Sequence, residues 1–174
     1  MRYIIAMTIY YSGRGDKGKS EMGAKKIAKD DPIFEALGSL DELNSWLGLC
    51  QDKRLKPIQE DLFIAQAEIG LAAMGRKSKI KITKLKTERL EKEIAKIDKV
   101  VPPIKKFIIP GGSELSTKLD FARALARRAE RDAVRMKASP DLLQYLNRLS
   151  SLLFALARLA NFRLKLKEKN PKYQ

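Results

Sequence analysis

The sequence predicts an all-α protein, a five-helix bundle preceded by an extended N-terminal arm and a glycine-rich loop. Apolar residues recur at helical spacing in five segments, prolines and glycines separate these segments, and the connections are short. At 174 residues the chain is long enough for one domain with its own core. We expect residues 1–31 to form the arm and loop, 32–166 the bundle, and 167–174 a frayed tail.

The first segment combines two signals. Residues 3–11 are rich in Ile, Tyr and Thr, which favours a short strand or an extended arm. Residues 13–20 match the P-loop pattern G-x-x-x-x-G-K-S, but the long helix and parallel strands of a P-loop fold do not follow. That fold is not expected. Closely spaced glycines can still direct backbone N–H groups at phosphate oxygens, helped by Lys17 and Lys19; a plain surface loop is the alternative.

The helices are predicted from apolar periodicity and from residues typical of helix ends. Leu40, Leu43 and Leu47 illustrate the spacing in the first helix, which Pro32 opens. Ser113 is a suitable N-cap for the fourth helix. The expected helices cover about 32–50, 57–75, 84–100, 114–136 and 140–166.

Composition excludes several kinds of chemistry. Cys50 is the single cysteine, so an internal disulfide is impossible, and the absence of histidine removes the usual zinc, haem and non-haem iron ligands. It also removes the commonest general base, while a hard cation such as Mg²⁺ remains compatible. Any reaction must then rest on positioning and electrostatics. Because no stretch reaches membrane-spanning length and the N-terminus does not resemble a signal peptide, we expect a cytoplasmic protein with no membrane partner.

The net charge of +15 raises the possibility of nucleic-acid binding. Residues 76–99 contain ten Lys or Arg against four Asp or Glu, interleaved with Ile and Leu as on the wet side of an amphipathic segment. Few aromatic residues accompany them, so a stacking platform for single strands is not evident. We interpret the charge as a generic basic surface and keep a basic helical-bundle nucleic-acid-binding protein as the alternative function.

The fourth helix carries a distinctive ionic face. Apolar Leu125, Ala129 and Met136 are predicted on the opposite side. The ionic face comprises Asp120, Arg123, Arg127, Glu130 and Arg131. A solvated surface is one interpretation. The other is an anion-binding face, because arginine binds phosphate through two parallel donors and small neighbouring alanines leave room for a ligand.

Five segments occur in a characteristic order: 12–20, 29–45 (with Lys29 to Pro32 and Gly38 to Ser45), 107–112, 127–131 and 145–150. Together they resemble the trimeric ATP:cob(I)alamin adenosyltransferases. The resemblance implies a five-helix homotrimer that binds ATP and a corrinoid between adjacent subunits. It implies transfer of the 5′-deoxyadenosyl group of ATP to the cobalt of cob(I)alamin, giving adenosylcobalamin and triphosphate, with a corrinoid reductase as a possible further partner.

The resemblance also implies residue roles. Those expected to bind ATP are Ser12, Gly13, Arg14, Gly15, Asp16, Gly18, Lys19, Ser20, Lys29, Arg127, Arg128, Glu130, Arg131 and Asn147. Arg127, Arg131, Asp41 and Phe107 are the expected catalytic residues, with Arg127 meeting Asp41 across a subunit boundary. Phe107 and Arg123 would contact the corrinoid, Phe107 at its lower face, and Glu130 would help to position Mg²⁺.

Some positions depart from the family pattern. Ser12, Gly13 and Arg14 stand where the family usually has Thr, Lys or Arg, and Thr, so the second threonine hydroxyl is missing. Asp120 replaces a common histidine, and we expect it to pair with Arg123 or Arg127. The family's first strand fits a start near Met7, so we expect residues 1–6 to be an upstream addition.

Overall fold

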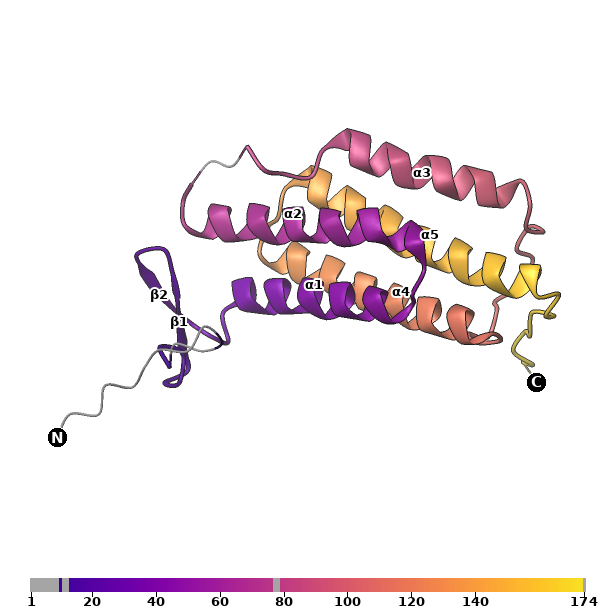
Figure 1. Ribbon diagram of the computed structural model, residues 1–174, viewed down its shortest axis with the longest axis horizontal. Coiled ribbons are helices and arrows are strands. Elements are labelled where there is room, and N and C mark those ends of the chain that lie inside the picture. The colour runs from indigo at the N-terminus through magenta and orange to yellow at the C-terminus, as the bar shows by residue number, and fades with distance from the viewer. Residues whose placement is uncertain (1–9, 11–12, 77–78, 174) are drawn as a thin grey trace.

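The protein folds as a helical bundle with a small β-hairpin at one end (Figure 1). The structure is a computed structural model that describes residue 10, residues 13–76 and residues 79–173. The helices of these residues are α1 (Pro32–Leu49), α2 (Lys56–Ala73), α3 (Lys84–Asp98), α4 (Glu114–Arg135) and α5 (Pro140–Arg163), with a single 3₁₀ turn, η1 (Lys53–Leu55). The predicted all-α class and the five predicted helices are confirmed.

Side-chain caps account for where three of the helices begin. Asp31 caps α1 by accepting a 2.9 Å hydrogen bond from the N–H of Ile33. Ser113 caps α4 as predicted, through the N–H of Ser116 at 3.2 Å. Ser139 caps α5 in the same way. Each cap provides an acceptor for a backbone donor that has no partner within its helix.

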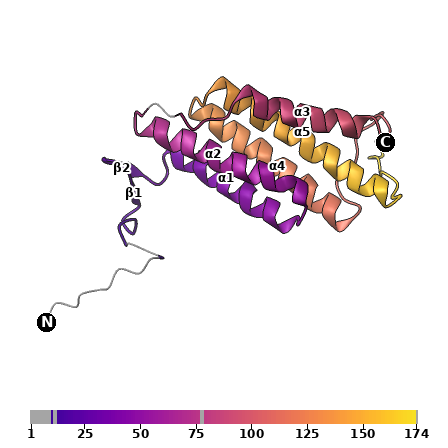
Figure 2. The same cartoon turned by 45° about the horizontal axis from the view of Figure 1, so that its top comes forward.

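Helix α4 lies between α1 and α5, while α3 packs on α5 and α2 packs on α1 (Figures 1 and 2). Ala122, Ala126, Ala129 and Ala133 are all completely buried along α4. We expected the alanines near the arginines to leave room for a ligand, but most of them are part of the hydrophobic core. Their small side chains let α4 approach its neighbours closely, and this packing fixes which way the remaining face of α4 points.

A buried carboxylate ties three helices together. Asp61 on α2 is 1% exposed and accepts a 2.9 Å hydrogen bond from the hydroxyl of Tyr145 on α5. Lys86 on α3 pairs with it at 2.5 Å, and Arg89 pairs with its other oxygen. Burial, followed by the charge of Asp61, raises the pKa of Tyr145 well above its ordinary value. We call these four residues the Asp61 cluster.

The glycine-rich segment leads into a hairpin that the sequence did not predict. Strand β1 (Lys19–Met22) pairs antiparallel with β2 (Lys25–Ala28). The turn between them rests on the end of α2, where Gly23 approaches Met74 and Lys25 Nζ donates to the Ala73 carbonyl at 3.4 Å. Figures 1 and 2 show the hairpin at the end of the bundle where α1 begins. The arm predicted over residues 3–11 lies outside the described residues, apart from Tyr10.

The segment that follows α5 contains no helix or strand up to residue 173, yet hydrogen bonds hold it against the protein. The Lys169 carbonyl accepts from the N–H of Ile109 at 2.8 Å, and the Asn170 side chain donates to the Phe107 carbonyl at 2.8 Å. Glu168 pairs with Arg158 of α5. Residues 168–170 thus contact both a distant loop and α5, while the expectation that residues 167–174 fray stays a prediction. Among the described helices, none has the length and apolar character needed to cross a membrane.

Candidate active site

A cleft of about 690 Å³ lies between the loop before α4 and the exposed sides of α4 and α5. Four of its lining side chains are cationic, none is acidic, and the others are apolar or serine. The lining residues are Ile104, Lys105, Lys106, Phe107, Ile108, Arg123, Arg127, Ser150, Ser151 and Phe154. The cleft thus offers an apolar surface beside concentrated positive charge, which suits a large flat ligand next to an anion.

Phe107, Arg123 and Arg127, which the sequence predicted as site residues, meet in this cleft. The Phe107 ring is 78% exposed, which is unusual for an aromatic side chain held in an ordered loop. The Arg123 guanidinium lies 6.0 Å from the centre of the Phe154 ring, and its Nε is buried without a hydrogen-bond partner. Arg123 therefore has one donor without a hydrogen-bond partner, and the Phe154 ring supports its guanidinium from one side.

Arg131 lies one turn beyond Arg127 on α4, and both are exposed. Arg131 Nη1 donates to the Arg127 carbonyl at 3.1 Å, so a backbone oxygen rather than a carboxylate is its described partner. Arg128 is different, because it forms an ion pair with Glu42 of α1. Of the three arginines predicted to bind ATP, two therefore remain open to a ligand while the third joins two helices.

Glu130 and Asn147, both predicted site residues, are joined by a 3.0 Å hydrogen bond from Asn147 Nδ2 to Glu130 Oε1. Arg148 Nη1 donates to Oδ1, the single oxygen of the Asn147 side-chain amide, at 2.8 Å. These bonds fix the Asn147 side chain between α4 and α5. Asp41 is exposed on α1, where a single chain does not test its predicted contact with Arg127 of another subunit.

The expected ion pair of Asp120 with Arg123 or Arg127 is not formed within the described chain. Asp120 Oδ2 instead accepts a 2.9 Å hydrogen bond from the N–H of Gly111, in the turn before α4. Burial raises the pKa of Asp120, while the Gly111 bond and the charge of Arg123 oppose the rise. The Asp120 carboxylate therefore binds a backbone donor of the turn and not an arginine side chain.

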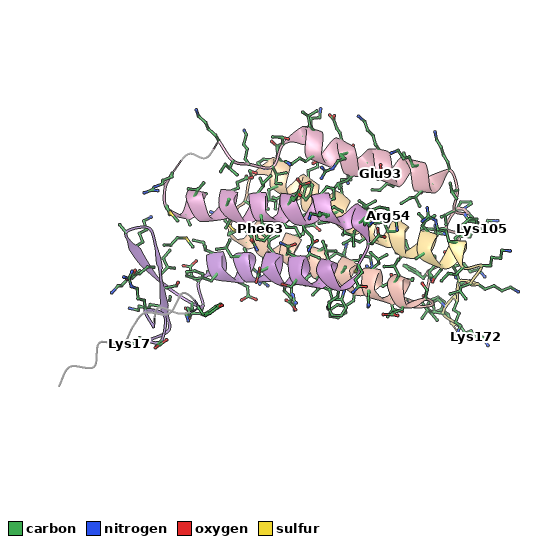
Figure 3. All side chains as sticks on the ribbon, in the orientation of Figure 1. Lys17, Arg54, Phe63, Glu93, Lys105 and Lys172 are labelled. Carbon is green, nitrogen blue, oxygen red and sulfur yellow. The ribbon has the colours of Figure 1, made fainter. Side chains whose placement is uncertain are left out.

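The glycine-rich loop lies away from the cleft in the same chain. Gly13 and Gly18 have φ angles of 67° and 70°, which glycine adopts readily. A side chain at Gly15 would come within 3.0 Å of Lys29 Nζ, so these two predicted phosphate ligands adjoin. Figure 3 shows Lys17 of this loop and Lys105 of the cleft at opposite ends of the molecule. Among the other predicted loop residues, Arg14 pairs with Glu21 at 3.2 Å. Asp16, Lys19 and Ser20 lie in the same loop and hairpin. Ser12 lies outside the described residues.

Magnesium would find few protein ligands here. No group of three or more His, Cys, Asp or Glu side chains gathers in the described parts of the chain. Mg²⁺ in nucleotide sites keeps several waters and is commonly held by phosphate oxygens with one or two carboxylates. Glu130, which belongs to the ionic face of α4, could serve as the single protein ligand of such an ion.

Sequence reasoning missed several lining residues. Lys105 and Lys106 directly precede Phe107 and add charge at the cleft, and their adjacency to the predicted aromatic was the available signal. Ser150, Ser151 and Phe154 lie on α5 within four residues of Asn147 or of one another. Helical spacing indicates which of these residues share a face of α5, but it does not indicate that the face borders a cleft.

Comparisons with known proteins show which family the chain is similar to. The family model described as cobalamin adenosyltransferase matches residues 10–160. The chain is 36% identical to a corrinoid adenosyltransferase of Bacillus subtilis over 88% of this chain and 86% of the relative. It is 38% identical to the corrinoid adenosyltransferase PduO of Salmonella typhimurium over 85% of this chain, which spans only 48% of that longer protein.

A solved structure is also similar. It is a phenylalanine-to-histidine variant of a PduO-type ATP:corrinoid adenosyltransferase from Lactobacillus reuteri, complexed with cobalamin and ATP. The TM-score is 0.85 at 34% identity, and the match covers 93% of this chain and 96% of that one. On the match of the family model and the identity to these relatives, the chain belongs to the cobalamin adenosyltransferase family.

Proposed function

We propose that this chain transfers the 5′-deoxyadenosyl group of ATP to the cobalt of cob(I)alamin, forming adenosylcobalamin and releasing triphosphate. One observation carries the proposal. In a chain of this family, the cleft of about 690 Å³ combines an exposed aromatic ring, Phe107, with Arg123 and Arg127. The similar Lactobacillus reuteri enzyme is complexed with cobalamin and ATP, the two substrates required.

The proposed reaction suits a protein without histidine. Cobalt(I) supplies the electron pair, a cobalt–carbon bond forms to C5′ of the ribose, and the bond from C5′ to the triphosphate oxygen breaks. Cobalt is formally oxidised to cobalt(III), and the triphosphate leaves with the electrons of the broken bond. The protein needs no general base: it must align C5′ with the cobalt and stabilise the charge of the leaving group.

The main predicted site residues then have defined tasks. The Phe107 ring lies against the lower face of the corrin and excludes an axial ligand there. Arg127 and Arg131 bind the phosphates through their open donors, and Glu130 holds Mg²⁺, which would neutralise part of the triphosphate charge. Asn147, fixed by Glu130 and Arg148, is set to bind the nucleoside.

The proposal includes a homotrimer with sites between subunits, and the position of the glycine-rich loop supports a site shared between copies. Lys17 of the loop and Lys105 of the cleft lie at opposite ends of one chain (Figure 3), which supports a site that two copies complete together. A loop from a neighbouring copy can reach the cleft, and the same boundary would bring Asp41 to Arg127. The cytoplasmic location and a corrinoid reductase that supplies cob(I)alamin remain predictions.

The test is anaerobic incubation of the protein with ATP, Mg²⁺ and cob(I)alamin, followed by the visible spectrum. We expect the absorbance of adenosylcobalamin to develop and to be lost on exposure to light. A reaction without protein and one without ATP are the controls. If active reductant and cob(I)alamin are confirmed and the spectrum still does not change, the proposal is wrong.

The variant Arg131→Ala tests the site itself. We expect it to lower the turnover rate by about 100-fold or more, which is typical for the loss of one preorganised charge partner of a leaving group. Its oligomeric state, measured by light scattering, should equal that of the unmodified protein. Full turnover by this variant would remove Arg131 from the ATP site.

A further inference from the structure

We propose that the segment from residue 166 to residue 173, which we call the C-terminal strap, positions Phe107 for the corrinoid. Glu168 and Asn170 act as positioning residues: they hold the loop that carries Phe107 and do not touch the reacting atoms. This inference rests on the proposed function, because it assigns a purpose to residues that lie behind the proposed corrinoid site.

The strap holds the loop at the carbonyl group of Phe107 and again two residues later. Asn170 Nδ2 donates to the carbonyl oxygen of Phe107 at 2.8 Å, and the N–H of Ile109 donates to the Lys169 carbonyl at 2.8 Å. Two consecutive strap residues therefore fix the backbone at position 107 and again at position 109. With its backbone held in this way, the Phe107 ring stands 78% exposed.

The strap is in turn anchored to the core. Arg158 on α5 has a side chain only 9% exposed, and it donates to Glu168 at 2.6 Å and 3.2 Å. The same guanidinium donates to the carbonyl of Pro102 at 2.8 Å, where the loop begins. One buried arginine thus binds the start of the loop and the strap together. Hydrogen bonds that involve charged groups are among the stronger ones in proteins, which makes this a firm anchor.

The loop needs such a restraint because it contains no regular secondary structure and exposes Ile104, Phe107 and Ile109. Apolar side chains on an unrestrained loop gain free energy by folding onto the surface. Here the ring instead stands between two hollows. One is the cleft, and the other, of about 610 Å³, is lined by Phe107, Lys106 and strap residues 170–173. The strap therefore keeps the ring presented to the ligand.

The primary test compares Asn170→Ala with Lys167→Ala in the full-length protein. Lys167 is an exposed strap residue for which the structure describes no hydrogen bond, so its variant is the matched control. We expect Asn170→Ala to raise the KM for cob(I)alamin about threefold to tenfold, the range for losing one hydrogen bond, while the KM for ATP stays unchanged. The control should change neither KM. Equal corrinoid KM values in both variants and the unmodified protein would overturn the inference.

A second measurement does not depend on catalysis. Hydrogen exchange of the Ile109 amide in the protein without ligands should be about threefold to tenfold faster in Asn170→Ala and in Glu168→Ala than in Lys167→Ala. Glu168→Gln keeps an acceptor for Arg158 and should lie between these variants. Unchanged exchange at Ile109 in both alanine variants would disprove the strap even if the enzyme is active. An inactive unmodified protein with fast exchange in these variants would instead contradict the proposed function alone.

Discussion

The Asp61 cluster and the ionic face of α4 both contain arginine and carboxylate side chains but differ in burial. In the Asp61 cluster, Lys86, Arg89 and the Tyr145 hydroxyl all converge on one carboxylate that is 1% exposed. On α4, Arg127 and Arg131 are exposed, and the described partner of Arg131 is a backbone carbonyl. The first arrangement satisfies every charge from within the chain. The second leaves donors for a ligand.

This difference shows that the number of arginines does not identify a binding site. A buried carboxylate loses its hydration and must be compensated by protein groups, so its cations are committed to the fold. Exposed arginines beside a cleft have no such commitment. The two regions should therefore respond in opposite ways to substitution, one through stability and the other through activity.

The largest effect is expected for Asp61→Ala. Removing the carboxylate leaves Lys86, Arg89 and Tyr145 without their shared partner, and breaking a buried ion pair costs about 3–5 kcal/mol of unfolding free energy. Urea denaturation followed by circular dichroism measures the loss. The control is Glu93→Ala, which breaks an exposed pair with Lys96 and should cost about 1 kcal/mol or less. Equal losses in the two variants would show that the Asp61 cluster is not the stronger tie.

The opposite response is expected for Arg127→Ala. It should lower kcat/KM for ATP by about 100- to 1000-fold through lost stabilisation of the leaving triphosphate, with a change in unfolding free energy within about 0.5 kcal/mol. Arg127→Lys should recover part of the activity, because it restores the charge without the paired donors. Lys118→Ala, on the same helix in an exposed pair with Glu114, is the control. Strong destabilisation by Arg127→Ala would make Arg127 a structural residue like Arg89.

The helices could be predicted from the sequence because their signals are local. Apolar spacing such as Leu40, Leu43 and Leu47 and a cap such as Ser113 lie within a few residues of the helix that they specify. The hairpin was missed because β1 and β2 lack a clear alternation of apolar and polar residues, and its turn is supported by Met74, some fifty residues away. The Asp61 cluster likewise joins residues from three helices, a pairing that no local pattern encodes.

The candidate site was predicted in part for the same reason. Phe107, Arg123 and Arg127 were singled out by motif and helical spacing, and they do share one cleft. The pairing of Arg128 with Glu42 was not predicted, because it depends on how α1 and α4 cross. The Asp120 contact was missed because it depends on the conformation of Gly111. A pattern on one helix indicates which side chains share a face but not what the neighbouring backbone offers them.

Asp120 is intermediate in burial between the Asp61 cluster and the exposed arginines of α4. The substitution Asp120→Asn gives the smallest predicted effect. Its pKa is raised chiefly by burial, so the folded state binds its proton more tightly than the unfolded chain does. The contribution of Asp120 to stability is therefore greatest below the ordinary carboxyl pKa and falls as the pH rises through the raised value. At pH 7 the neutral asparagine, which keeps an oxygen for the Gly111 N–H, should stabilise the protein by less than about 1 kcal/mol.

Thermal unfolding between pH 3.5 and pH 7 measures this effect. The advantage of Asp120→Asn should shrink as the pH falls, because Asp120 itself becomes protonated and the two proteins then carry the same charge at this position. If Asp120→Asn is instead less stable than the unmodified protein at pH 7, attraction between Asp120 and Arg123 outweighs the cost of burial. Asp120 would then belong with Asp61, as a carboxylate whose charge the fold requires, and Arg123 would be committed to the protein rather than to the corrinoid.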